Sequence, residues 1–229
     1  MGETENTRNT VMETFFNVSA KAKINVIIPM EINKHCCGQI YSSKGFKDAF
    51  AFMANETVSK LWDTTQQGKF PVVLDISSCT QTLMHCRSIF SEVNKERYDA
   101  LTIIDSIDYL HDYIMINTTV TQKKGAIVLH PVCSLKKMPG TEDKLYKIAA
   151  RFADKVIYPF HAGCCGMAGD RGFLHPELTF SATLAEAKEV KNVNCDGHYS
   201  SSKTCEIALS DAIGQHYVSI LNLVDECCS

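Results

Sequence analysis

The stretch CCGMAGDRGF at residues 164–173 has a second copy in this chain, CCGQIYSSKGF at residues 36–46. Both copies read Cys-Cys-Gly, a short variable segment, a cation, and then Gly-Phe. They start 128 residues apart, at positions 36 and 164, and each follows an apolar run that ends near a proline. Farther on, DISSCT at residues 75–80 resembles DGHYSSSKTC at residues 196–205. This internal repeat predicts two pseudo-equivalent halves with a junction near Gly125.

Short apolar runs and amphipathic segments alternate around these motifs. These runs do not alternate apolar with polar residues, and they are rich in β-branched residues. Both features are typical of strands buried on both faces. The amphipathic segments repeat apolar residues at helical spacing. We therefore expect an α/β fold, a duplicated cysteine-rich domain of two lobes with short, mainly parallel sheets flanked by helices. The predicted strands are residues 25–29, 71–76, 101–104, 126–129 and 155–158, and the predicted helices are residues 46–62, 145–152, 176–190 and 206–224.

Composition and charge narrow the class of protein. The chain has 229 residues, a formal net charge of -3 and 45% hydrophobic residues, the balance of an ordinary globular protein with a sizeable core. A near-neutral charge argues against a nucleic-acid-binding protein, since phosphates require a concentrated basic face. The sequence carries no Gly-x-Gly-x-x-Gly after a strand, no Walker-type loop and no nucleophile elbow. It therefore indicates no flavin, nicotinamide or nucleotide site of its own.

The N-terminal segment predicts both the domain limits and the compartment. Residues 1–22 are polar, contain acids and lack the apolar core of a signal peptide, so we expect a disordered leader. Residues 23–124 would then form the first half and residues 125–229 the second. No segment approaches the roughly 18 apolar residues needed to span a bilayer. These features predict a cytoplasmic protein, for which any membrane association would come through a partner.

Cysteine is the unusual residue type of this chain. There are 11 cysteines, with vicinal pairs at positions 36–37, 164–165 and 227–228. An odd total and adjacent pairs make a poor disulfide framework, because neighbouring cysteines rarely meet disulfide geometry. Clustered thiols in a reducing compartment indicate metal or redox chemistry instead.

Four cysteines of the second half fall at predicted strand ends or strand-to-helix turns. These points converge on one edge of an open α/β sheet, where ligands bind. Four convergent thiolates form a soft site that suits an iron–sulfur cluster or zinc. Adjacent ligands are awkward around one tetrahedral ion and easier around several metal atoms, so the vicinal pair favours a cluster. The predicted set is Cys133, Cys164, Cys165 and Cys205.

The first half carries a related set of cysteines, and glycines lie near both sets. Cys36, Cys37 and Cys79 are the counterparts, and Cys86 follows Cys79 by seven residues. Glycines in and after each motif would let the backbone approach a cluster and donate N–H groups to sulfur; these are Gly38, Gly166, Gly169 and Gly172. The competing interpretation, that a cysteine is a small buried hydrophobe, is the one we adopt for Cys195, Cys227 and Cys228.

Several polar residues near the motifs have two interpretations each. His35 and His161 lie just upstream of a Cys-Cys pair, where an imidazole could bind cluster sulfur or move a proton. We expect structural roles for them, and likewise for His130 and His198, which lie near site thiols in sequence. Asp170 and Arg171 could bind an anionic partner group, but an ion pair within the loop is the simpler prediction.

These motifs resemble a known family. With CCGMAGDRGF at 164–173 and SSSKTCE at 200–206, the chain resembles the C-terminal cysteine-rich region of FAD-linked, iron–sulfur D-lactate dehydrogenases. That region is related to glycolate oxidase iron–sulfur subunits and to the corresponding cysteine-rich subunits of heterodisulfide reductases. The resemblance covers residues 25–226 and implies a duplicated α/β domain that handles electrons. In full-length family proteins, a flavin domain oxidises a 2-hydroxy acid and a ferredoxin-like domain carries further 4Fe-4S clusters.

The resemblance therefore implies an electron-transfer module with a 4Fe-4S cluster, which is not sufficient for catalysis alone. FAD would lie on a flavoprotein partner or an upstream domain, and a ferredoxin-like domain or subunit would be a second partner. The alternatives are a non-catalytic zinc-binding or scaffold fragment of such a complex, and a gene remnant with no function of its own.

Two departures from the family limit the first site. The family's first half opens with a strand that ends in Pro-x-Cys, the counterpart of residues 131–133, but residues 1–35 contain no cysteine. The opening strand and its ligand are thus expected to be missing. In the second half, the Cys-x-x-Cys of the heterodisulfide reductase relatives becomes SKTC at residues 202–205. The resemblance accordingly indicates the downstream piece of a longer protein.

Overall fold

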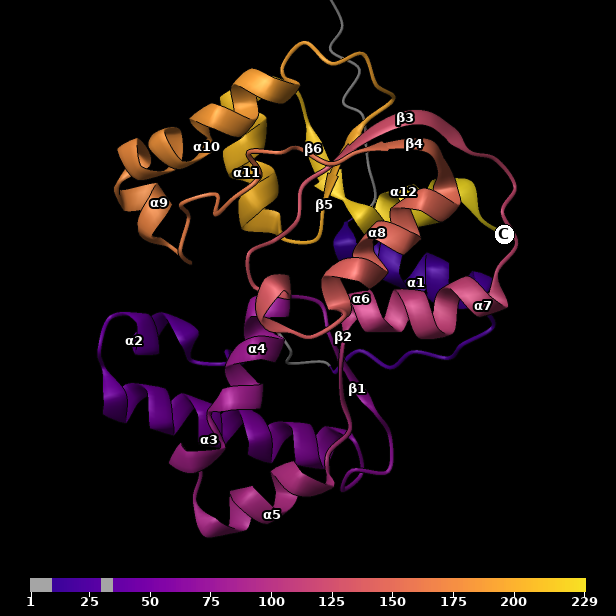
Figure 1. Cartoon of the computed structure of the whole chain (residues 1–229). Helices are drawn as coiled ribbons and strands as arrows, with labels where there is room; N and C mark the ends of the chain where they lie inside the picture. The colour runs from indigo at the N-terminus through magenta and orange to yellow at the C-terminus, as the bar shows by residue number, and fades with distance from the viewer. Residues whose placement is uncertain (1–9, 30–34) are drawn as a thin grey trace, which may run out of the picture.

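The computed structural model describes residues 10–29 and 35–229, which form two lobes (Figure 1). The first lobe contains a two-stranded parallel sheet, β1 (Val72–Leu74) and β2 (Ile103–Asp105). The second contains a four-stranded parallel sheet in the order β4-β3-β5-β6. Its strands are β3 (Lys124–Leu129), β4 (Ala153–Ile157), β5 (His198–Ser200) and β6 (Tyr217–Ser219). The predicted α/β class, with short parallel sheets flanked by helices, is confirmed.

Helices surround both sheets. Those up to the end of β2 are α1 (Val11–Lys21), α2 (Gln39–Ser43), α3 (Lys47–Thr64), α4 (Ser77–His85), the 3-10 turn η2 (Arg87–Ile89) and α5 (Glu92–Ala100). After β2 come α6 (Ser106–Tyr109), the π-helical turn η3 (Leu110–Ile114), α7 (Met115–Asn117), the 3-10 turn η4 (Leu135–Lys137), α8 (Thr141–Phe152), α9 (Arg171–Leu174), α10 (Pro176–Val190), α11 (Lys203–Ile213) and α12 (Ile220–Cys227). Within the described ranges, none of these helices combines the length and the apolarity that crossing a bilayer requires.

Two predicted elements near the N-terminus are wrong. Residues 25–29 form no strand, and the side chain of Ile27 is 76% exposed. The predicted leader ends in an ordered helix, because Thr10 and Glu13 form a capping box and the amphipathic helix α1 follows. Val18 of α1 is fully buried, and α1 packs on α12. Residues 1–9 of the predicted leader lie outside the described residues.

The predicted helix over residues 206–224 is also wrong. Helix α11 ends at Gly214, whose φ of 70° is left-handed and whose N–H binds the carbonyl of Ser210. The chain then enters β6, and Ser219 caps α12 by accepting the N–H of Leu221. The helical spacing of apolar residues over 206–224 therefore spans two helices and the edge strand β6 between them.

The main hydrophobic core does not follow the predicted junction at Gly125. Val18 of α1, Ile107 of α6 and Ile114 of η3 are buried in one cluster with Ile127 of β3 and Phe152 of α8. The first lobe has its own smaller core, made of Cys37, Ala54, Val58, Leu83, Cys86 and Phe90. Helices from the first part of the chain thus complete the core beneath the second sheet.

Candidate functional site

The structure brings together the four cysteines predicted for the second half. Cys133 follows β3, Cys164 and Cys165 follow β4, and Cys205 lies in the first turn of α11. The Sγ atoms of Cys165 and Cys205 are 3.1 Å apart, and Cys133 shares a hydrogen bond with Cys164. The other three thiols all raise the pKa of Cys205, which places the set in one electrostatic neighbourhood. Parallel strands that end at one edge account for this convergence.

The first half repeats half of this arrangement. The Sγ atoms of Cys37 and Cys79 are 3.2 Å apart, as in the pair Cys165–Cys205. In both pairs, the second cysteine of a Cys-Cys motif meets a cysteine at the start of a helix. Cys36 and Cys37 both raise the pKa of Cys79, so the three thiols are neighbours. Cys86 is buried near Cys37, and its Sγ donates to the carbonyl of Leu83 at 3.5 Å.

Shared hydrogen bonds divide the thiols into two kinds. The hydrogen bond shared with Cys205 lowers the pKa of Cys165 to about 7, and the hydrogen bond shared with Cys79 does the same for Cys37. The pKa of Cys164 falls to about 5, because Cys133 donates to it, the N–H of Gly166 donates as well, and His130 and Lys137 bring positive charge near it.

Their partners behave in the opposite way. The shared hydrogen bonds and burial raise the pKa values of Cys79, Cys133 and Cys205. Burial raises the pKa of Cys86 to about 12. In each close pair, the shared hydrogen bond therefore lowers the pKa of one thiol and raises the pKa of its partner.

The glycine of each motif is required by backbone conformation and by space. Gly38 and Gly166 have φ values of 81° and 78°, in the left-handed region. The N–H of Gly38 lies 3.5 Å from the Sγ of Cys36, and the N–H of Gly166 binds Cys164. A Cβ on Gly166 would lie 2.8 Å from the carbonyl oxygen of Leu178 on α10. The N–H groups of these two glycines thus point at cysteine sulfur.

The later glycines differ from these two. Gly169 has a similar φ of 79°, but a Cβ there would meet nothing within 4 Å. Gly169 is therefore required by the backbone conformation of the turn and not by close packing. A Cβ on Gly172 would instead lie 2.5 Å from the Sδ of Met167, so this glycine gives the loop room to fold back on itself.

His130 is the histidine that lies beside the thiols. It is fully buried, and its Nδ1 is 2.9 Å from both carboxylate oxygens of Glu186 on α10. His130 is one of the groups that lower the pKa values of Cys164 and Cys165, so the imidazole is close to both thiols. Its Nε2 is buried without a hydrogen-bond partner. No local pattern marks Glu186, which lies on an ordinary helix and is a long way from His130 in the chain.

The other polar candidates lie elsewhere or have structural contacts. His198 is buried against the ring of Tyr217, with centroids 5.0 Å apart, and His161 pairs with Glu189 at the surface. The Nε2 of His35 is buried without a partner, like that of His130. Asp170 binds Lys44 at 2.7 Å, so the expected ion pair forms between the two motif loops and not within one loop.

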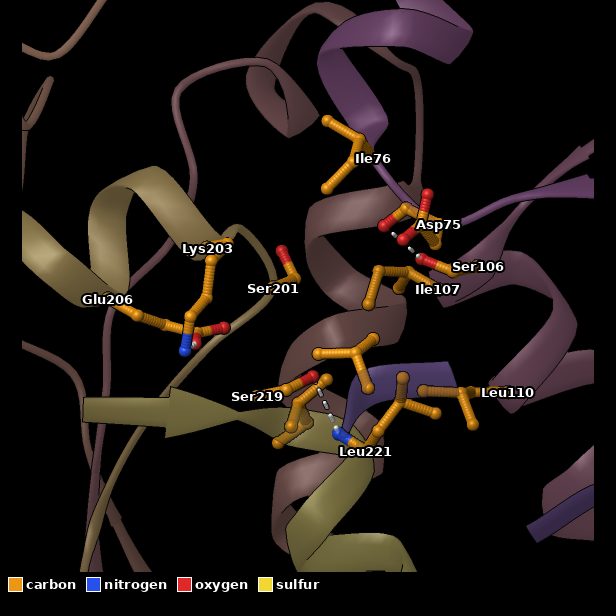
Figure 2. A pocket seen from close by; sticks show the side chains of 12 residues that line it. Asp75, Ile76, Ser106, Ile107, Leu110, Ser201, Lys203, Glu206, Ser219 and Leu221 are labelled. Carbon is orange, nitrogen blue, oxygen red and sulfur yellow. Dashed lines mark hydrogen bonds and ion pairs between the residues drawn. The ribbon is translucent and has the colours of Figure 1, made fainter. Parts of the chain in front are cut away.

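The two motif loops and the elements beside them meet between the lobes. The Lys44–Asp170 ion pair joins the two motif loops, and α4, which carries Cys79, contacts η4, which follows Cys133. A small pocket of about 50 Å³ lies between the lobes near α4 and α11. Figure 2 shows Asp75 and Ser106 of the first lobe opposite Ser201, Lys203 and Glu206 of the second. Burial raises the pKa values of Asp75 and Glu206.

The close sulfur pairs are spaced as hydrogen-bonded thiols. At 3.1 and 3.2 Å, the close sulfur pairs are farther apart than a disulfide, about 2.05 Å. They are closer than the roughly 3.8 Å between two thiolates on one tetrahedral zinc at about 2.3 Å. In the part of the chain that the structure describes, no three His, Cys, Asp or Glu residues surround one point as a single ion requires. The thiols, the N–H donors and the imidazole of His130 are groups that can bind a metal ion or a metal cluster.

Comparison with known proteins agrees with this arrangement. Among curated proteins, lactate utilization protein A of Oceanobacillus iheyensis is 20% identical over 167 residues, which are 70% of this chain and 66% of that relative. The chain thus aligns with slightly less than two thirds of the relative's length. The CCG family, described as a cysteine-rich domain, matches residues 4–84 and 127–210. Since these two matches contain both Cys-Cys-Gly motifs and more than half of the chain, the protein belongs to the CCG cysteine-rich domain family, in two copies.

Proposed function

We propose that this chain is the iron–sulfur electron-transfer module of a FAD-dependent 2-hydroxy-acid dehydrogenase of the D-lactate or glycolate type. The convergence of Cys133, Cys164, Cys165 and Cys205 at one sheet edge carries the proposal. Likeness to a protein named lactate utilization protein A supports a lactate-type substrate for the whole system. The FAD belongs to a flavoprotein partner or to another domain, so the chain is not sufficient for catalysis alone.

The second-half thiols would hold a 4Fe-4S cluster. Such a cluster accepts one electron and spreads it over several irons and sulfurs. The residues of this chain would tune that step, since the N–H groups of Gly166 and Met167 already point at sulfur. The N-terminus of α11 adds a positive dipole end beside Cys205. The first-half set, Cys36, Cys37, Cys79 and Cys86, would bind incompletely by itself.

Exposed aromatic side chains beside the motifs offer a docking surface for the electron partner. Phe46 and Phe173 end the two motif repeats, Phe160 precedes the second motif, and all three are mostly exposed. Large exposed apolar side chains near a redox site are typical of interfaces. A flavoprotein or a ferredoxin-like domain that docks there would bring its cofactor close to both thiol sets. We place this complex in the cytoplasm, with any membrane contact made by the partner.

Anaerobic reconstitution tests the proposal. The full chain is reconstituted with iron and sulfide, and metal content, absorption and EPR spectra are measured. Cys205→Ser should lose most of the second cluster, whereas the matched Cys195→Ser should not, because Cys195 lies against His198 outside the set. Protein that binds no iron under these conditions, yet carries one equivalent of zinc, would overturn the proposal.

The incomplete first set supports a second candidate. A site with no counterpart of Cys133 could serve a non-catalytic, zinc-binding or scaffold fragment of such a complex. Metal analysis separates the two functions, because a cluster gives a brown protein with iron and sulfide, and zinc gives a colourless one.

A further inference from the structure

The imidazole of His130 is held rigidly at the carboxyl end of the second sheet. His130 directly follows β3, and its backbone N–H donates to the carbonyl of Tyr199 in β5 at 2.9 Å. The side chain is fully buried, and Nδ1 lies 2.9 Å from both carboxylate oxygens of Glu186 on α10. The sheet therefore fixes the backbone of this residue, and α10 fixes the orientation of its ring.

The other ring nitrogen of His130 has no partner in the protein. Its Nε2 is buried and makes no hydrogen bond, which is unusual for a buried polar atom. A neutral imidazole that donates its Nδ1 hydrogen to a carboxylate keeps a lone pair on Nε2. The ring also lies close to the thiols of Cys164 and Cys165. A nitrogen lone pair is therefore available beside two cysteines of the predicted metal site.

Glu186 supplies a second, independent observation. Its side chain is only 3% exposed, and no lysine or arginine among the described residues pairs with it. A buried carboxylate is costly unless a positive charge and hydrogen bonds compensate it. A metal bound to Nε2 of His130 would bring that positive charge to the other side of the ring. Carboxylate, histidine and metal are combined in this order in many protein metal sites.

We propose that His130 is a metal ligand of the second-half site, binding through Nε2, and that Glu186 is the positioning residue that orients its ring. This inference rests on the proposed function, which places a metal group at the four thiols. In the described part of the chain, these donors do not surround one point as a single ion requires, so Nε2 would bind one metal of a wider group. Histidine in place of cysteine raises the reduction potential of an iron–sulfur centre. His130 would therefore favour acceptance of an electron.

His161 provides a matched control within the same chain. It precedes Cys164 by three positions, as His130 precedes Cys133. Its Nδ1 likewise lies 3.1 Å from a carboxylate oxygen of a glutamate, Glu189. The His161 side chain is 56% exposed, however, whereas that of His130 is 1% exposed. His161→Gln should therefore leave metal binding unchanged, and His130→Gln should alter it.

Pulsed EPR of the full chain with ¹⁵N-labelled histidine rings is the test, after anaerobic reconstitution with iron and sulfide and then reduction. We expect strong ¹⁵N coupling from one imidazole in the parent chain and in His161→Gln, and its loss in His130→Gln. Glu186→Ala should weaken iron binding about 10- to 100-fold, and Glu186→Gln, which keeps an acceptor for Nδ1–H, should restore most of it. Circular dichroism establishes that each variant is folded. Strong coupling that survives in His130→Gln, or disappears in His161→Gln, would overturn the proposal.

Two further measurements separate this inference from the proposed function. Long-range ¹H–¹⁵N NMR of the reduced, metal-free chain should find Nε2 of His130 without a proton at neutral pH, and a proton there would overturn the ligand role. A chain that takes up no iron is titrated with zinc. If zinc then shifts the Nε2 resonance of His130 and not that of His161, the ligand role stands and the electron-transfer function fails. An iron–sulfur cluster that shows no strong imidazole coupling gives the reverse result, and a chain that binds neither metal overturns both.

Discussion

Replacement of Gly166 by alanine separates close packing from backbone conformation at the motif. Left-handed φ costs an alanine about 1 to 2 kcal/mol. At Gly166 the new Cβ would also lie 2.8 Å from the carbonyl oxygen of Leu178 and 3.0 Å from the Cβ of Ala182. Forcing a methyl group into such a space costs about 1 to 3 kcal/mol more. Gly166→Ala should therefore lower the free energy of unfolding by about 2 to 5 kcal/mol.

Gly169→Ala is the matched control for this substitution. Its φ of 79° is nearly the same, but the added Cβ would have open space around it. It should lose only the conformational part, about 1 to 2 kcal/mol. Urea unfolding of the reduced, metal-free chain measures both values. Equal losses of unfolding free energy in the two variants would contradict this explanation. They would mean that α10 leaves room for a methyl group at Gly166.

Three further outcomes follow from contacts in the structure. Glu186→Ala leaves the buried His130 without its partner and should cost about 1 to 3 kcal/mol in urea unfolding, whereas Glu186→Gln, which keeps an acceptor, should cost less. The lowered pKa of Cys164, about 5, means that its thiolate persists down to that pH; iodoacetamide mapped by mass spectrometry should still label it at pH 6 in the metal-free chain. Cys133→Ala should weaken that low-pH labelling, because the shared hydrogen bond is the largest cause of the low pKa, and an unchanged labelling rate would contradict that bond. Val18→Ala should cost about 1 to 3 kcal/mol, and a loss near zero would mean that α1 is not part of the core.

Local patterns predicted the elements whose own residues carry the signal. Strands β1 to β4 appear as apolar runs, and α10 begins at Pro176 as its first-turn proline indicates. Local patterns did not predict strand β5, because its residues, His198, Tyr199 and Ser200, are mostly polar although they are buried. Burial there comes from the neighbours β3 and β6, which no local pattern reveals. Local patterns likewise could not predict the contact between Glu186 and His130, because the two residues are 56 positions apart in the chain.

The site divides in a similar way. The sequence predicted which second-half cysteines converge, since strand ends of a parallel sheet share an edge. It could not predict that the thiols meet in pairs, because that depends on side-chain directions set by tertiary packing. It also treated residues 25–29 as a strand on their composition alone. A strand needs a neighbour, and the structure offers none to this run within the described residues.

The asymmetry between the lobes has a physical explanation in the main core. A two-stranded sheet is marginal on its own, and the first lobe buries only a small core around Ala54 and Leu83. Val73 of β1 and Ile104 of β2, however, pack against the large core that lies beneath the second sheet. Helices α1 and α6 extend the same core toward the first lobe. The two-stranded sheet of the first lobe is therefore supported by the core of the second lobe.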